Sequence, residues 1–237
     1  MSTTTFTNFP AEGIQFMHDL VQNNERDWFN PRKELYKTHI VEPAIAFIEA
    51  IGNRLQHLSP NIQYDTRTNG SGSLMRIYRD TRFSKDKTPY KDYVGIIFWE
   101  GSGKKTECPG FHLGLTGSGA GIHVGMYGFP KPMLAAYRQA VVDDALGAAL
   151  IEAVTAVQQA GYTVGGEHYK RVPRGFDADH PRADWLRYAA LFASSGDIPA
   201  SVVTSDSFLD VCFDHFEKMA PIQQWLVKVA RTAEGTK

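Results

Sequence analysis

The chain has 237 residues, of which 43% are hydrophobic, and its formal net charge is −1 at pH 7. This length and apolar content suffice to bury one large core, and no linker divides the chain, so we expect a single domain over residues 1–237 with short disordered ends at 1–7 and 232–237. The near-zero net charge excludes a protein whose whole surface binds a polyanion, so a nucleic-acid role would need a local patch.

The first predicted elements are helices. Phe9-Pro10 opens a pattern of apolar residues at helical spacing, and Asn23-Asn24 ends it. A second helix is predicted to start at Asn30-Pro31, because an N-cap residue followed by proline is typical of a helix start. Proline lacks the amide hydrogen that a helix interior needs, so Pro43 predicts a kink or a new helix, which continues to Leu55.

The character of the sequence changes between about residues 73 and 127. Apolar residues alternate with others there, and glycines interrupt the runs at hairpin-like intervals. The predicted strands are Leu74–Arg79, Tyr93–Trp99, Phe111–Thr116 and Gly121–Tyr127. The short turn at Gly117–Ala120 makes the last two strands an antiparallel pair.

Helical patterns return after this region. The predicted helices are Lys131–Val142, Ala145–Gln159, Pro181–Ala193, Ser207–Met219 and Pro221–Ala230. Because the strands are grouped between helical ends and do not alternate with helices, the predicted fold class is α+β. Its central, mainly antiparallel sheet would lie at about residues 62–127, covered by the N- and C-terminal helices.

One segment concentrates positive charge. Between Arg67 and Lys91, seven basic residues stand against Asp80 and Asp86, a net charge of +5 in a chain whose total is −1. Such a local charge attracts phosphates and carboxylates. The candidate anion-binding residues, with two added from a later loop, are Arg76, Arg79, Arg82, Lys85, Lys87, Lys91, Lys170 and Arg174. The alternative is that these charges form internal ion pairs, which fix a long loop without binding a ligand.

Arg79 has a special place in this segment. On a strand, Met75, Ile77 and Arg79 point to the same face, because side chains alternate with a period of two. If Met75 and Ile77 face the core, Arg79 is drawn toward it and needs a carboxylate or a bound anion as partner. We therefore predict that Arg79 is paired and more buried than the basic residues that follow it in the loop.

Three motifs carry a family resemblance. They are RIYRDTRFSKDKTPYK (Arg76–Lys91), NNERDWF (Asn23–Phe29) and KRVPRGFDADHP (Lys170–Pro181). With them the chain resembles, from Phe9 to about Leu226, the bacterial and fungal family designated domain of unknown function 2461 (DUF2461). The resemblance implies a single-domain unit of this length, and it implies no particular activity, ligand or catalytic residue.

Two further groups are candidates for other chemistry. Asp177, Asp179 and His180 are metal-type ligands, or they cap and complement a helix that begins at Pro181. His112 and His123 are predicted on one face of the hairpin, where two imidazoles bind a metal or act as acid and base, or simply lie exposed or hydrogen-bonded on the sheet. No third ligand is in register, so we predict no metal and no cofactor.

The cellular setting follows from what the sequence lacks. Residues 1–7 have neither the positive nor the apolar region of a secretory signal, and no apolar run reaches the ~18 residues that span a bilayer. Cys108 and Cys212 lack metal-ligand spacing, which favours reduced thiols. We expect a cytoplasmic protein with no membrane partner, and the sequence leaves the oligomeric state open.

Two hypotheses for the function remain. The first is an intracellular domain that binds, or as an enzyme acts on, a phosphorylated or other anionic small ligand through the Arg76–Lys91 motif. The alternative is a non-catalytic interaction module, whose basic loop docks an acidic protein surface or a nucleic-acid backbone. The nucleophile-elbow, zinc-protease and dinucleotide motifs are absent, so no catalytic residue is assigned.

Overall fold

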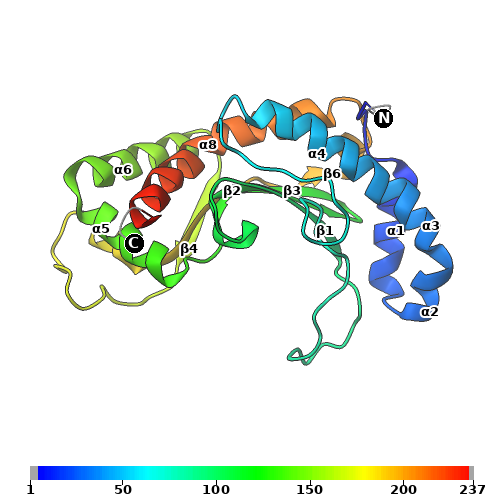
Figure 1. Ribbon diagram of the computed structural model, residues 1–237, viewed down its shortest axis with the longest axis horizontal. Coiled ribbons are helices and arrows are strands. Elements are labelled where there is room, and N and C mark those ends of the chain that lie inside the picture. Colours follow the sequence, from blue (N-terminus) through cyan, green and yellow to red (C-terminus); the bar gives the residue numbers. More distant parts are fainter. Residues whose placement is uncertain (1–4, 235–237) are drawn as a thin grey trace. The chain divides into compact units, whose positions relative to one another are not determined.

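A computed structural model describes residues 5–234 (Figure 1). The chain divides into two compact units. Unit 1 comprises Met1–Phe98, His112–Ile122 and Gly196–Asp214, and unit 2 comprises Trp99–Phe111, His123–Ser195 and His215–Lys237. The prediction of a single domain stays a prediction.

Within the described residues the sheet has six antiparallel strands in the order β1-β2-β3-β5-β4, and β6 pairs with β3. The strands are β1 Tyr93–Trp99, β2 Gly110–Thr116, β3 Gly119–Met126, β4 Thr163–Glu167, β5 Tyr188–Ser194 and β6 Ile198–Pro199. With helices at both ends of the chain, this confirms the predicted α+β class. The predicted limits of 62–127 are wrong, because β4, β5 and β6 lie beyond them.

The helices account for most of the remaining regular structure. They are α1 Ala11–Gln22, α2 Arg26–Phe29, α3 Lys33–Tyr36, α4 Glu42–Leu55, α5 Lys131–Val142, α6 Asp144–Gln159, α7 Ala200–Val203 and α8 Phe208–Glu234. Asn30-Pro31 forms a 3₁₀ turn inside a helical stretch that begins at Arg26, so the predicted helix start was placed too late. A π turn at Lys37–Val41 precedes α4, which has Pro43 in its first turn as the sequence predicts.

Three predicted elements need correction. The predicted strand Leu74–Arg79 makes only two isolated bridges, Leu74 to Ile96 and Tyr78 to Tyr90. The predicted helix Pro181–Ala193 is wrong, because Ala183–Arg187 is a 3₁₀ turn and the next residues form β5. β5 pairs on both sides, with β3 and β4, and the apolar run of such an interior strand is easily confused with a buried helix. The predicted break at Pro221 is absent, since Pro221 lies inside α8.

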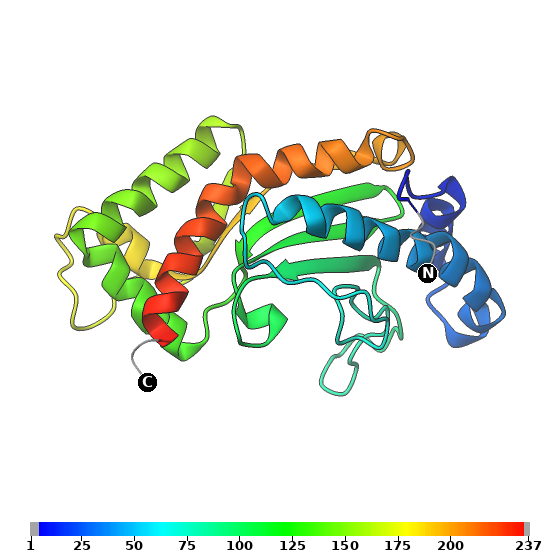
Figure 2. The same cartoon turned by 45° about the horizontal axis from the view of Figure 1, so that its top comes forward.

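The core of unit 1 lies between helices and strands. Helix α4 and the first part of α8 run side by side over the strands of this unit, with Phe47 stacked on Phe208 at a centroid distance of 5.7 Å (Figure 2). Phe6 is buried against Phe47 and Phe9. Of the ends predicted as disordered, 1–4 and 235–237 lie outside the described residues. The chain is nonetheless packed at Phe6 and helical up to 234, further toward both ends than that prediction allows.

Unit 2 has its own apolar centre. Tyr137 of α5 is fully buried, and its ring meets Trp225 of α8 edge to face at 5.7 Å. The indole nitrogen of Trp225 donates to the carbonyl of Leu146 in α6 at 2.9 Å, and the Tyr137 hydroxyl donates to the carbonyl of Trp185 at 3.0 Å. These bonds satisfy polar groups that burial would otherwise leave unpaired.

Candidate functional site

A cluster of aromatic rings supports the base of the basic loop in unit 1. Phe29, at the end of α2, is 2% exposed and stacks on Tyr90 with ring centroids 4.1 Å apart. Tyr78 contacts both rings, at 6.4 Å from Phe29 and 5.4 Å from Tyr90. The two ends of the loop, at Tyr78 and Tyr90, are therefore fixed on the α2 segment by packing.

A side-chain amide makes the same connection through hydrogen bonds. Asn24, between α1 and α2, donates from Nδ2 to the carbonyl of Tyr90 at 3.0 Å and accepts on Oδ1 from the amide of Tyr90 at 3.0 Å. The Asn24 side-chain amide thus pairs with both backbone groups of Tyr90, as a neighbouring strand would. The NNERDWF and RIYRDTRFSKDKTPYK motifs, 66 residues apart at this pair, meet here.

The loop between Arg79 and Tyr90 is held by its own charges. Arg79 forms an ion pair with Asp86 and donates to the Thr88 hydroxyl at 2.7 Å. The Arg79 side chain is 32% exposed, compared with 77% for Arg82, and Lys85 and Lys87 are also exposed. This confirms the prediction that Arg79 is paired and more buried than the loop bases after it.

The ion pair at Arg79 predicts a dependence on pH. Hydrogen bonds from the amide and hydroxyl of Thr88, then from Arg79, lower the pKa of the Asp86 carboxyl from 3.8 to about 2. Because this pKa is lower in the folded state, its stabilising effect is complete above about pH 4 and is lost as the pH falls toward 2. We expect a carbon-13 NMR titration to give a pKa of about 2 for the Asp86 carboxyl, and we expect the Thr88→Val variant to return this pKa toward 3.8. An Asp86 carboxyl that titrates near 3.8 in the unaltered protein would contradict this.

An open cleft of about 680 Å³ lies between this loop and the turn from α1 to α2. It is lined by Asn24, Glu25, Arg26, Tyr78, Arg79, Thr81, Lys87, Thr88 and Pro89. All of these residues belong to unit 1. Three cationic side chains from the two motifs therefore face one concave space, which is the usual form of a small-molecule site.

The charges in the cleft differ in how they are compensated. Arg79 has Asp86, whereas within residues 5–234 neither Arg26 nor Lys87 lies at ion-pair distance from a carboxylate. Lys87 donates to the backbone carbonyl of Thr81 at 2.8 Å, which leaves its charge without an opposite partner. Burial raises the pKa of Tyr90 and the nearby Arg26 opposes this rise, which places the Arg26 charge near the aromatic cluster.

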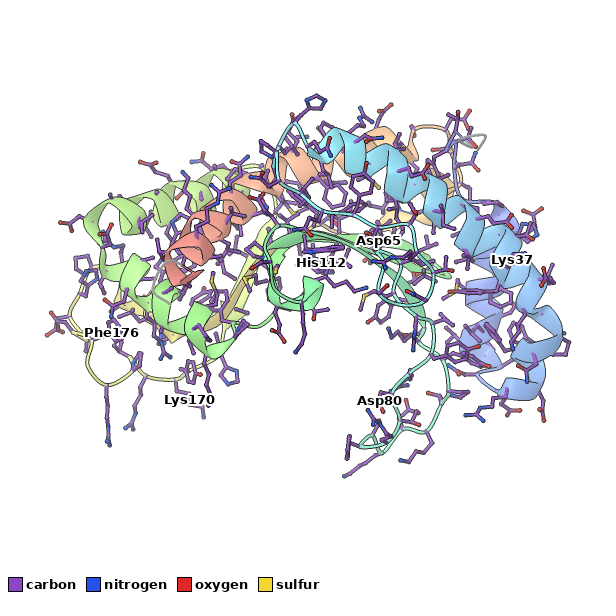
Figure 3. All side chains as sticks on the ribbon, viewed as in Figure 1. Lys37, Asp65, Asp80, His112, Lys170 and Phe176 are labelled. Atoms are coloured by element: carbon purple, nitrogen blue, oxygen red, sulfur yellow. The ribbon has the colours of Figure 1, made fainter. Side chains whose placement is uncertain are left out.

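The structure separates the predicted anion-binding residues. Arg79 and Lys87 line the cleft. Arg82 instead binds Asp80 at 2.7 Å, in the outer part of the loop where Figure 3 labels Asp80. The other unit 1 candidates lie outside the lining: Arg76 donates to the carbonyl of Asn69, Lys91 donates to the carbonyl of Arg76 at 2.9 Å, and Lys85 is exposed. Lys170 and Arg174 are exposed in a loop of unit 2, where Figure 3 labels Lys170.

Sequence reasoning missed the contribution of the α1–α2 turn. Asn24, Glu25 and Arg26 line the cleft, yet the sequence analysis used their motif only for the family resemblance. The charged residues of NNERDWF were the available signal. Their position beside the basic loop depends on a contact between residues that are far apart in the sequence. The spacing of apolar residues along the chain does not reveal such a contact.

The other candidates have local roles. His180 accepts from the amide of Arg182 at 3.0 Å, and Asp177 accepts from the amide of Asp179 at 2.9 Å, so both make local turn contacts. The helix that they were predicted to cap is not formed, and among the described residues the 3₁₀ turn Ala183–Arg187 has no side-chain cap. His123 Nδ1 lies 2.8 Å from the Ser194 hydroxyl, and burial lowers the pKa of this imidazole. The two histidines belong to different units, His112 to unit 1 and His123 to unit 2. Within residues 5–234, no group of three or more His, Cys, Asp or Glu side chains is arranged to hold a metal.

The comparisons with known proteins give a family. The model of the family described as "Conserved hypothetical protein (DUF2461)" matches residues 12–225, most of the chain and all of the cleft lining. No curated protein matches the chain. Among the described helices, none combines the length and apolarity that crossing a membrane requires.

Proposed function

We propose that this chain, which belongs to the DUF2461 family, binds a phosphorylated or other anionic small molecule in the cleft between the α1–α2 turn and the basic loop. The observation that carries the proposal is the pair of cations, Arg26 and Lys87, which line one cleft without a carboxylate partner among residues 5–234. Arg79, which lines the same cleft, is held in place by Asp86 and Thr88. The proposal concerns binding and assigns no bond-breaking step.

Physical chemistry favours an anion with several oxygens at this place. Hydrogen bonds between a cationic donor and a phosphate oxygen are about twice as strong as neutral ones. Arginine presents a planar fork of donors, and lysine adds a mobile point charge. The hydroxyl of Thr81, which also lines the cleft, is a suitable additional donor to a phosphate, whereas the Thr88 hydroxyl already donates to Asp86.

The test is ligand-dependent thermal stabilisation. We expect pyrophosphate to stabilise the protein, by about 2.7 kcal/mol at a concentration a hundred times Kd. Arg26→Ala and Lys87→Ala each remove a charge-assisted hydrogen bond worth roughly 1.5–3 kcal/mol, so Kd should rise about ten- to a hundredfold. Both side chains are exposed, so the stability of the free protein should change by less than about 1 kcal/mol.

Lys85→Ala is the matched control. Lys85 is an exposed lysine of the same loop, two residues from Lys87, and it does not line the cleft. It should leave the Kd for pyrophosphate within about twofold, since exposed charges at a distance are screened by salt. Equal losses in Lys85→Ala and Lys87→Ala would show a diffuse charge effect and count against a defined site.

One observation favours the second candidate function, an interaction module. Phe83 is 93% exposed in the basic loop, with the Arg82 guanidinium 5.7 Å from its ring. An exposed aromatic residue among bases is typical of a contact with an acidic protein surface or a nucleic-acid backbone. In that case pyrophosphate would give no stabilisation, and affinity for an acidic macromolecule would fall steeply with salt.

A further inference from the structure

Besides positively charged residues, the lining of the cleft includes an aromatic and an acidic residue. Tyr78, which has an aromatic ring, and Glu25, which has a carboxylate, line the cleft together with the cations Arg26, Arg79 and Lys87. We infer that the ligand is a free ribonucleotide, with its base on Tyr78, its phosphates on the cations and its ribose hydroxyls on Glu25. This inference rests on the proposed function, because it names the class of anion that the same cleft binds.

Tyr78 has the properties of a stacking platform. Its side chain lines the cleft and is 52% exposed, although it is in contact with two buried rings, those of Phe29 and Tyr90. The buried neighbours hold the Tyr78 ring in place before a ligand arrives, so little conformational entropy is lost on binding. A fixed aromatic ring beside cations is the combination that binds nucleotides through base stacking and phosphate contacts.

Glu25 needs a different explanation from the cations. Its side chain is exposed, and within the described chain its carboxylate makes no hydrogen bond or ion pair, even with the adjacent Arg26. A carboxylate close to a bound phosphate is repelled unless it accepts hydrogen bonds from the ligand. Ribose hydroxyls are such donors, and nucleotide sites commonly use an acidic residue to bind them.

Other anions satisfy only part of this set. Inorganic pyrophosphate leaves the Tyr78 ring and the Glu25 carboxylate unused, and a sugar phosphate leaves the ring unused. A nucleic-acid strand would need a continuous row of available lysine and arginine side chains beyond the cleft. Arg82, which lies nearby in the loop, is instead paired with Asp80. The free ribonucleotide accounts for all three chemistries.

Calorimetric titration of the full chain with pyrophosphate, ADP and 2′-deoxy-ADP tests this. A stacked base contributes about five- to 150-fold in affinity, so we expect ADP to bind at least about tenfold more tightly than pyrophosphate. Tyr78→Leu should remove this advantage, so that its Kd values for ADP and pyrophosphate agree within about twofold. Tyr78→Phe keeps the ring and is the matched control, in which the advantage persists.

The ribose contact has its own pair of measurements. ADP should bind more tightly than 2′-deoxy-ADP to the unaltered protein, and Glu25→Gln should reduce that ratio toward one. Loss of the base advantage in Tyr78→Leu together with this change in ratio supports the ribonucleotide.

Three results would overturn the inference. Equal affinity for ADP and pyrophosphate would overturn the ribonucleotide inference and leave the proposed anion site in place. Binding of neither ligand would remove the proposed function as well. Binding of an oligoribonucleotide without binding of ADP would assign the cleft to single-stranded RNA instead.

Discussion

Phe29→Ala is expected to lower the free energy of unfolding by about 3–5 kcal/mol, the range measured for truncating a buried phenylalanine. Phe29 is 2% exposed, stacks on Tyr90 at 4.1 Å, and meets Phe16 and Tyr36 at 5.8 and 5.5 Å. Its removal leaves a cavity at the point where the basic loop rests on α2. Urea denaturation followed by circular dichroism measures the loss.

Phe83→Ala is the control of the same chemistry in the same unit. Phe83 is 93% exposed, so its truncation removes almost no buried surface and should change the unfolding free energy by less than about 0.5 kcal/mol. Phe29→Ala should also weaken pyrophosphate binding, because the cleft loses the support of its aromatic base. A cost below about 1 kcal/mol for Phe29→Ala would show that the aromatic cluster is not the anchor of the loop.

The parts of the fold that the sequence predicted are those with regular local patterns. The bounds of β1 and α5 agree with the predicted strand Tyr93–Trp99 and helix Lys131–Val142, and β2 and β3 differ from theirs by one or two residues. In each case the pattern alone distinguishes strand from helix. β5 was predicted as a helix because Ala189, Ala190 and Leu191 give no alternation, and its pairing with β3 and β4 depends on distant residues.

The candidate site was predicted only in part, because its geometry also depends on contacts between residues that are distant in the sequence. The excess of basic residues is visible in the sequence, and strand parity predicted a carboxylate or a bound anion as the partner of Arg79, which Asp86 confirms. Charge alone could not show which of the lysine and arginine residues line a cleft. Arg82 turns to Asp80, whereas Lys87 turns to the cleft, and the difference arises from the path of the loop and the position of the α1–α2 turn.

Asn24→Ala is expected to cost about 2–4 kcal/mol in unfolding free energy. The Asn24 amide supplies both a donor to the carbonyl and an acceptor for the amide of Tyr90, each at 3.0 Å, and Tyr90 is buried. Without it, two backbone groups lose their partner, and each buried unsatisfied group costs about 1–3 kcal/mol. Asn24→Asp keeps the acceptor but loses the donor and places a charge against the carbonyl, so it should not restore stability.

Asn23→Ala separates this role from a general effect of the turn. Asn23 is the neighbouring asparagine, and within residues 5–234 its side-chain amide donates only to the carbonyl of Asp19 at the exposed end of α1, at 2.9 Å. Its truncation should cost less than about 1 kcal/mol and leave the Kd for pyrophosphate unchanged, because no part of Asn23 lines the cleft. Asn24→Ala should instead raise that Kd, since Arg26 and Lys87 hold their positions only while the turn and the loop are tied together. If the two variants lose stability and binding equally, the Asn24 amide does not tie the turn to the loop, and the two sides of the cleft are positioned by the aromatic cluster alone.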